Sequence, residues 1–495
     1  MAITKISLAP GVFREGTSYS AEGKYFAGDK IRFRSGNPEK IGGWQRLSAA
    51  TFLGTCRSMV NWATLAGDNY IGLGTNLKYY IEEGGGYADI TPIRKVVDPM
   101  ANNPFASGYN TLASDITADA QTITLTSGTS FPSTGGIIRI DLEEIYYSSR
   151  AGNDLQGCVR GYNGTVATTH TVTTPVACST IVVTDANHGA VQNDFVTFSS
   201  ATAFGGFSIT DLNKEQQVFQ YISTTQYSIN IAGVFATSAA SGGGASIKAE
   251  YQTNTGLDTY VIGLGWGADP WGSGGWGDPG VVGIGQQLRL WSADNYGEDL
   301  VIAPRGGTLY YWDATLGTTQ RAVRLGDLST AAGFSGAYVP TNTNQVVVSP
   351  TERFVIAMGA NPYEPGNPNT TFDPMLVRWS DQENPYEWVP AVTNQSGEFR
   401  LSHGSYIVGS VATRQEQLIF TDAALYSMQY LGPPYVFGFN PLAENISVMS
   451  PNAMITANNI TYWMGVDKFY VYCDIDLLLQ PSESSPCRTY SRIAC

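Results

Sequence analysis

The sequence has 495 residues, of which 43% are hydrophobic and only 14% are charged, so it exceeds what one hydrophobic core usually fills. Its 28 Lys and Arg against 42 Asp and Glu give a net charge of −14, and the absence of basic clusters argues against a clamp on nucleic acid. No apolar run approaches a membrane helix, the first residues lack the apolar core of a signal peptide, and the six cysteines form no CxxC pair. We therefore expect a multidomain protein that is made in the cytoplasm and is not stably inserted in a membrane. Neither a disulfide framework nor a zinc ribbon is expected.

Strand-like runs dominate the chain, and five units share one plan: an aliphatic strand, a short turn, and a strand rich in aromatic or apolar residues. In chain order the units are Asn69–Tyr80, Asp299–Trp312, a looser one from Arg353 to Ser380, Gln417–Met428 and Ile460–Tyr472. The later units lie about 40 to 65 residues apart, near the spacing of four-stranded propeller blades. The pattern predicts an all-β chain with a β-propeller-like platform, but the repeats are too degenerate to count blades.

A segment of different texture, rich in Thr, Ser and Gly, interrupts the platform between residues 105 and 251. Its short strands alternate with turns, as in a small β-sandwich or barrel. We predict two inserted β modules, 105–172 and 173–251, between the two parts of the platform, 1–104 and 252–472. Residues 473–495 hold three of the six cysteines and are interpreted as an atypical C-terminal tail. Truncation or a frameshift is the hypothesis for this tail, with the last propeller strand missing or supplied from elsewhere.

The segment Gly263–Gly280 contains eight glycines and three tryptophans in eighteen residues. Gly263, Gly265 and Ala268 match the G-x-G-x-x-A pattern of a dinucleotide-binding turn, which requires a helix to hold the pyrophosphate. The next residues, DPWGSGGWGDPG, cannot form that helix, so no cofactor is expected. Glycine allows close backbone approach and tryptophan supplies contact area, so we interpret the loop as the anchor of a subunit or domain contact. The candidate interface residues are Trp266, Trp271 and Trp276.

Catalytic and metal-binding patterns are weak. The segment SADNYG from Ser292 departs from the sialidase S-x-D-x-G box because Gly297 falls one residue late, and a turn stabilised by Asp294 and Asn295 is the favoured interpretation. Glu143 and Glu144 are adjacent, so a strand would point them to opposite faces and they cannot act as a pair. We expect neither a catalytic site nor a metal site. A propeller that binds or cleaves host glycans is the alternative function, and a host-surface adhesin is a third.

Histidines and tryptophans have structural interpretations as well. His170 and His188 lie beside turns in the inserted modules and are expected to hydrogen-bond them, and with His403 they are the only histidines. Aromatic residues at strand ends could stack on bases or sugars, but without a basic groove beside them packing between sheets is favoured. The residues concerned are Trp312, Trp379, Trp388 and Trp463.

Several motifs in the second half of the chain resemble the tail nozzle proteins of short-tailed bacteriophages, which are also called tail tubular protein B or packaged-DNA stabilisation proteins. The matching segments are RWSDQENPYEW (Arg378–Trp388), TRQEQLIFTDAALYSMQ (Thr413–Gln429), GPPYVFGF (Gly432–Phe439), MSPNA (Met449–Ala453) and, near the start, GDKIRFRSGNPEKIGGWQRL (Gly28–Leu47). The inserted modules are similar to small β domains that decorate phage structural proteins. None of these motifs is a catalytic signature.

The resemblance implies a structural virion protein rather than an enzyme. It implies a homohexameric ring in the tail, below the adaptor ring that joins portal and tail, with attachment surfaces for tail fibres or spikes and a tail needle as a further partner. Genome DNA would pass through the channel without sequence-specific binding during ejection and viral genome delivery. The charge balance fits this independently, because a negative channel wall does not adhere to sliding DNA.

Overall fold

The computed structural model describes residues 8–43, 45–46, 48–256, 288–368, 371–466, 468–473 and 491–493. The chain divides into two compact units, Met1–Thr51 and Phe52–Cys495. The smaller unit holds a parallel pair, β1 (Ala9–Val12) with β2 (Lys24–Tyr25), and an antiparallel pair, β3 (Ile31–Arg34) with β4 (Asn37–Lys40). The sequence placed residues 1–104 in the platform, whereas the structure separates the first 51 residues. The reason is that these short strands have almost no core, since Ala21 is their one buried apolar residue among those described.

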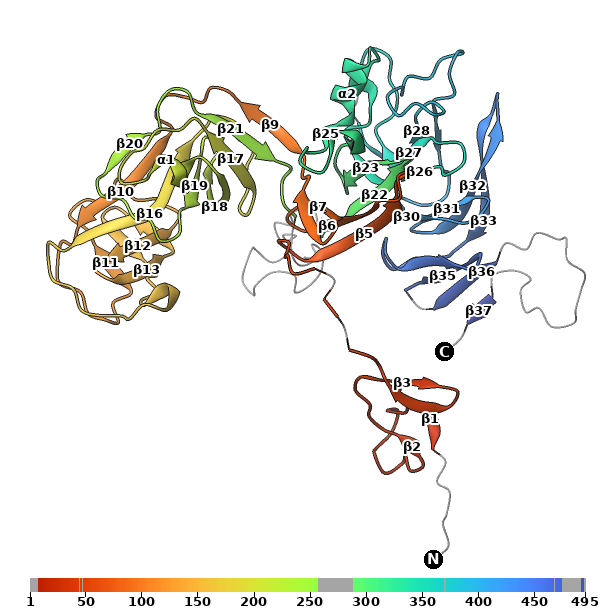
Figure 1. Cartoon of the computed structure of the whole chain (residues 1–495), viewed down its shortest axis with the longest axis horizontal. Coiled ribbons are helices and arrows are strands. Elements are labelled where there is room, and N and C mark those ends of the chain that lie inside the picture. Colours follow the sequence, from red (N-terminus) through yellow and green to blue (C-terminus); the bar gives the residue numbers. More distant parts are fainter. Residues whose placement is uncertain are drawn as a thin grey trace, which may run out of the picture. The chain divides into compact units, whose positions relative to one another are not determined.

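Five antiparallel four-stranded sheets form the platform, and within each sheet consecutive strands are neighbours (Figure 1). The first sheet comprises β5 (Cys56–Ala63), β6 (Asn69–Thr75), β7 (Tyr79–Glu83) and β8 (Gly86–Asp89). The second comprises β22 (Trp291–Tyr296), β23 (Asp299–Pro304), β24 (Tyr310–Trp312) and β25 (Val323–Arg324). The third comprises β26 (Thr343–Val348), β27 (Val355–Ala360), β28 (Asp373–Trp379) and β29 (Gly397–Arg400). The fourth comprises β30 (Ile407–Ala412), β31 (Gln417–Thr421), β32 (Ala424–Gly432) and β33 (Val436–Glu444). The fifth comprises β34 (Met454–Ala457), β35 (Ile460–Met464), β36 (Phe469–Cys473) and β37 (Ser491–Ile493).

The five strand–turn–strand units predicted from the sequence are the two middle strands of the five sheets, for example β6 with β7 and β35 with β36. In the first four sheets these strands are the most buried, because a neighbouring strand lies on each side and side chains pack on both faces. Helical residues are few in the described platform: η2 (Ala314–Leu316) lies between β24 and β25 of the second sheet, and α2 (Leu325–Ala331) and η3 (Gly336–Tyr338) lie between the second and third sheets. The all-β, propeller-like fold class is therefore confirmed.

Consecutive sheets pack face to face through aromatic cores. Trp62, Tyr79 and Trp312 fill the space between the first and second sheets. Four further tryptophan and tyrosine side chains play the same part between the later sheets: Trp388 (second and third), Trp379 (third and fourth), and Trp463 with Tyr470 (fourth and fifth). The packing interpretation of the strand-end tryptophans is thus confirmed, because all of them are buried and none is accessible to a base or a sugar. They are Trp312, Trp379, Trp388 and Trp463.

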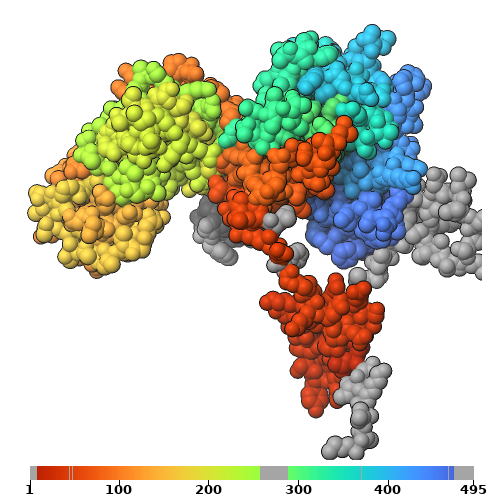
Figure 2. Space-filling model, viewed as in Figure 1, coloured from red at the N-terminus to blue at the C-terminus, as the bar shows by residue number. Residues whose placement is uncertain are grey.

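The region between the first and second sheets forms a separate body of strands, seen as one continuous surface from orange to green in Figure 2. Its first and last strands, β9 (Ile93–Val97) and β21 (Lys248–Gln252), pair antiparallel, so the chain leaves the platform and returns to it side by side. The other strands of its ten-stranded sheet are β10 (Phe105–Thr111), β12 (Gly136–Ile140), β13 (Glu143–Tyr147), β16 (Pro175–Thr184), β17 (Phe195–Ser199), β18 (Glu215–Ser223), β19 (Gln226–Asn230) and β20 (Ala240–Gly242). A three-stranded sheet of β11 (Thr122–Thr124), β14 (Ser149–Ala151) and β15 (Asp154–Gln156) completes it, with η1 (Tyr162–Gly164) and α1 (Ile209–Leu212).

Two separate apolar cores divide this inserted region, one around Ile138 and Ile145 and one around Phe198 and Ile229. We predicted the boundary between the two modules at residue 172, but in the structure β16 contributes to both modules. Its first half pairs with β12 and its second half with β19. A ten-residue strand is long enough to span both cores, so the modules share a backbone rather than meeting at a linker.

The C-terminal end differs from the predicted tail. Ser491–Ile493 form β37, which pairs antiparallel with β36 and supplies the fourth strand of the fifth sheet. The last propeller strand therefore comes from this chain. Cys473 is the last residue of β36, and the remaining residues of the predicted tail, 474–490 and 494–495, lie outside the described residues.

Candidate functional site

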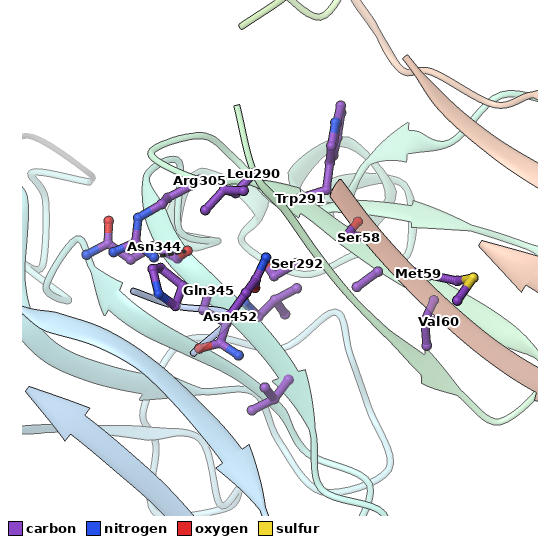
Figure 3. Close-up of a pocket in the computed structure, with 14 residues that line it drawn as sticks. Ser58, Met59, Val60, Leu290, Trp291, Ser292, Arg305, Asn344, Gln345 and Asn452 are labelled. Atoms are coloured by element: carbon purple, nitrogen blue, oxygen red, sulfur yellow. Dashed lines mark hydrogen bonds between the residues drawn. The ribbon is translucent and has the colours of Figure 1, made fainter. Parts of the chain in front are cut away.

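The first strands of the first three sheets, together with Arg305, Pro451 and Asn452, line a small cavity of about 160 Å³ (Figure 3). Its polar lining consists of Ser58, Ser292, Arg305, Asn344, Gln345 and Asn452. Among these lining residues there is no carboxylate, histidine or cysteine that could act as a base toward the hydroxyls of Ser58 and Ser292.

The polar side chains around the cavity connect neighbouring sheets. Gln345 of β26 donates from Nε2 to the Ser410 carbonyl (3.1 Å) and accepts the Ser410 N–H (2.7 Å), both on β30. Arg305 reaches across to the carbonyl of Val408 at 3.0 Å, and burial lowers its pKa. Asn452 donates to the Arg57 carbonyl at 3.4 Å, which links the fifth sheet to the first. These bonds serve the assembly of the platform.

The SADNYG segment from Ser292, on β22, also connects neighbouring sheets. Ser292 Oγ and Asp294 Oδ2, both on β22, accept the N–H groups of Val346 and Val348 on β26 at 2.9 and 2.8 Å. Burial raises the pKa of Asp294 to about 6. Asn295 makes the expected turn bond, to the Gly297 carbonyl at 3.1 Å. Asp294 Oδ1 accepts the N–H of Asn295 at 3.0 Å, so Asp294 bonds to the turn backbone as predicted and also bridges two sheets.

A second cluster of ionisable groups lies in the first inserted module. Glu143 is buried, whereas Glu144 of the same strand is half-exposed, which confirms that the pair splits between opposite faces. Glu143 accepts two bonds from Arg160 at 2.8 Å, one from the Gly161 N–H at 3.0 Å and one from the Thr168 N–H at 3.1 Å. His170 completes the shell, with Nε2 2.8 Å from Glu143.

This cluster is not a catalytic triad. Burial opposes the ionisation of Glu143, but the bonds from Arg160 and His170 outweigh it and lower its pKa to about 2. A fixed carboxylate with every lone pair engaged does not abstract protons near neutral pH. His188 is likewise structural, because its Nδ1 accepts the Ala190 N–H at 2.9 Å and its Nε2 lies 2.8 Å from the Ser223 carbonyl. The structural interpretation of both histidines is confirmed by these contacts.

An ion-pair network joins the inserted region to the platform, and no motif in the sequence indicates it. Lys78 of the first sheet is buried and contacts Asp89 at 2.7 Å and Glu215 of β18 at 2.6 Å. Arg321 lies 3.1 Å from Asp89 and 3.6 Å from Glu215. Burial raises the pKa of Asp89, but Arg321 and Lys78 outweigh this and lower it. The network is spread over 240 residues of sequence, so no local pattern could have revealed it.

The segment 423–466, which we call the charge-poor segment, contains one charged residue, Glu444. It runs from the outer hairpin of the fourth sheet through most of the fifth. Seven of its large apolar side chains are exposed: Leu431, Tyr435, Leu442, Met449, Ile455, Tyr462 and Val466. An exposed surface that is both apolar and uncharged marks an interaction site. A count of charges along the sequence would have found this segment.

The proposed interface tryptophans, Trp266, Trp271 and Trp276, lie outside the described residues, as does the whole Gly263–Gly280 segment. Among the described residues no group of three His, Cys, Asp or Glu side chains could hold a metal ion. In the same part of the chain no helix is long and apolar enough to cross a membrane.

The fold and the cavity define an all-β, propeller-like protein with an inserted two-core β region. No protein-family profile matches the sequence, and no curated protein matches it. The chain is similar to Hsv2 of Kluyveromyces lactis, with 8% identity over 41% of this chain and 48% of that one, at a TM-score of 0.22. It is similar to the endosialidase of phage phi92, with 10% identity over 81% of this chain and 60% of that one, at a TM-score of 0.20. It is also similar to AztD of Citrobacter koseri, with 10% identity over 76% of this chain and 90% of that one, at a TM-score of 0.25. Scores this low carry no inference about function.

Proposed function

We propose that this chain is a structural component of a short phage tail: a nozzle subunit that forms a six-fold ring through which genome DNA passes. The ring lies below the adaptor ring and offers attachment surfaces to fibres or spikes. In this proposal the protein performs no chemistry on its own.

The observation that carries the proposal is the role of the two buried charged residues in the segments that resemble nozzle proteins. Arg378, in RWSDQENPYEW, is 1% exposed, and its Nη1 and Nη2 donate to the carbonyls of Asn361 and Trp388, each at 2.9 Å. Glu416, in TRQEQLIFTDAALYSMQ, accepts from Ser427 of the fourth sheet and from Tyr472 Oη of the fifth, the latter at 2.9 Å. Both residues join elements of the platform, and this supports a scaffold role for the two motifs.

The charge of the chain supports a role as a conduit. Each copy carries a net charge of −14, so a six-membered ring carries −84. Affinity for DNA depends on Lys and Arg that neutralise phosphates, and an acidic ring lacks this driving force. DNA can therefore slide through the ring without adhering to its wall.

Electron microscopy of the purified full-length chain tests the proposal. Six-fold rings with an open or closed axial channel are the expected result. A chain that stays monomeric at high concentration, or that forms trimers which bind host cells, would contradict it. Release of sugar from host polysaccharide by the monomer would instead establish the glycan-cleaving alternative.

A further inference from the structure

The charge-poor segment and the adjoining strand β36 carry two separate apolar surfaces. One is the tip of the β32–β33 hairpin, residues 429–438, which we call the hairpin tip. The other is the face of the fifth sheet that points away from the fourth sheet, which we call the open face. Both are carried by every copy of the chain, and neither has a covering element among the described residues.

The hairpin tip extends past the rest of its sheet. β32 and β33 are nine residues long, whereas β31 is five residues long and pairs only as far as Met428 (Figure 1). At the tip Leu431 is 61% exposed and Tyr435 is 77% exposed. Pro433 and Pro434 lie between them and restrict the backbone, so little conformational entropy remains to be lost when the tip docks.

The open face is uniformly apolar. The register pairs Ile455 with Tyr462 and Tyr462 with Val471, while Trp463 and Tyr470 point the other way into the core against the fourth sheet. All seven residues on the open face of β34, β35 and β36 whose side chains are described are apolar: Ile455, Ala457, Ile460, Tyr462, Met464, Phe469 and Val471. Ile455 is 64% exposed, and Phe469 is 50% exposed.

Among the described residues the first sheet does not cover this face, because Ile455 and Phe469 keep 64% and 50% of their surface exposed. On the first sheet the ring of Phe52 lies 6.1 Å from that of Tyr80 and 5.2 Å from that of Tyr87, and the Tyr80 side chain is buried. The described part of the chain therefore leaves the open face uncovered.

We propose that the hairpin tip of one copy docks on the open face of the next copy, so that the two surfaces form a head-to-tail contact. This inference rests on the proposed ring and identifies its contact. A ring requires two different complementary patches on each subunit, and the chain supplies one projecting and one flat apolar patch. Copies that each carry −14 repel one another, and this repulsion is weakest where the contacting surfaces hold no charge. Tyr435 and Leu431 are the anchors, since interface energy is concentrated in a few buried aromatic and aliphatic side chains.

Charge substitution at the two surfaces tests the contact. Tyr435→Asp and Ile455→Asp place a charge in the interface, and both positions are exposed enough for the monomer to fold. Each change is expected to raise the concentration needed for half-assembly by about tenfold or more, as measured by native mass spectrometry and sedimentation. Val392→Asp, at an exposed apolar position outside both surfaces, is the matched control and is expected to assemble like the unaltered chain.

The double variant Tyr435→Lys with Ile455→Asp separates this contact from general disruption. If tip and face meet, lysine on one copy faces aspartate on the next, and assembly recovers relative to either single change. Normal rings from both single variants, or a double variant no better than the singles, would overturn the contact while leaving the ring intact as a proposal. Failure of the unaltered chain to form rings would refute the proposed function itself.

Discussion

Replacement of Arg378 is the sharpest test of the scaffold role assigned to the RWSDQENPYEW segment. Arg378→Met removes two charge-assisted hydrogen bonds to the carbonyls of Asn361 and Trp388 and leaves both acceptors buried. Each such bond contributes about 1.5–3 kcal/mol, so we expect the free energy of unfolding to fall by about 3–6 kcal/mol. Glu398, 3.6 Å from the Arg378 side chain, would also lose its cation.

Arg378→Lys should recover only part of this loss. A lysine keeps the positive charge but cannot direct two donors to two carbonyls in a fixed fork. Arg400→Met on the adjacent β29 is the matched control, because Arg400 is exposed and its pair with Asp373 lies at the surface, where such pairs contribute about 1 kcal/mol or less. Urea denaturation followed by tryptophan fluorescence, with hydrogen exchange of β28, measures the difference. The reasoning fails if the Arg378→Met variant loses no more stability than the Arg400→Met variant.

Three further predictions concern other buried charges. Lys78→Met leaves two carboxylates without their buried cation, so we expect a loss of about 3–5 kcal/mol and faster hydrogen exchange in β9 and β21. Lys248→Met is the control, because Lys248 is partly exposed and pairs with Glu250 near the surface. Burial raises the pKa of Asp294 from 3.8 to about 6, so the folded state favours the protonated side chain. Its contribution to the free energy of unfolding is complete below about pH 4 and is lost as the pH rises through 6. Asp294→Asn should therefore flatten the fall in melting temperature between pH 4 and pH 7, and an unchanged slope would contradict the assignment. Glu143→Gln replaces one of the two carboxylate oxygens that accept from Arg160 with an NH₂ donor and removes the negative charge. We expect the free energy of unfolding of the first inserted module to fall by about 3 kcal/mol or more, and to change little in Glu144→Gln.

The pH dependence of Glu143 has the opposite sign to that of Asp294. Its pKa is lowered from 4.5 to about 2, so its contribution to stability is present above pH 4.5 and is lost as the pH falls through 2. Lowering the pH should therefore reduce the stability of the first inserted module, whereas protonation of the buried Asp294 should increase the stability of the platform. Thermal unfolding at a series of pH values distinguishes the two.

Local sequence determined the strands of this protein. The hairpins Asn69–Tyr80 and Ile460–Tyr472 were predictable because alternation of apolar residues and short Gly or Asp turns act over a few residues. The split of Glu143 and Glu144 followed from the period of a strand alone.

Tertiary structure alone decided how these strands meet. The number of sheets, the sharing of β16 by two cores, and the return of Ser491–Ile493 as the last strand depend on pairings between distant segments. The contacts of Lys78 with Glu215 and of Ser292 with Val346 join residues 137 and 54 positions apart. Such bonds form only when sheets stack, because their geometry is fixed by backbone twist and by the packing of large side chains between sheets. A sequence specifies which side chains are available for these bonds, and the fold determines which of them come within reach of one another.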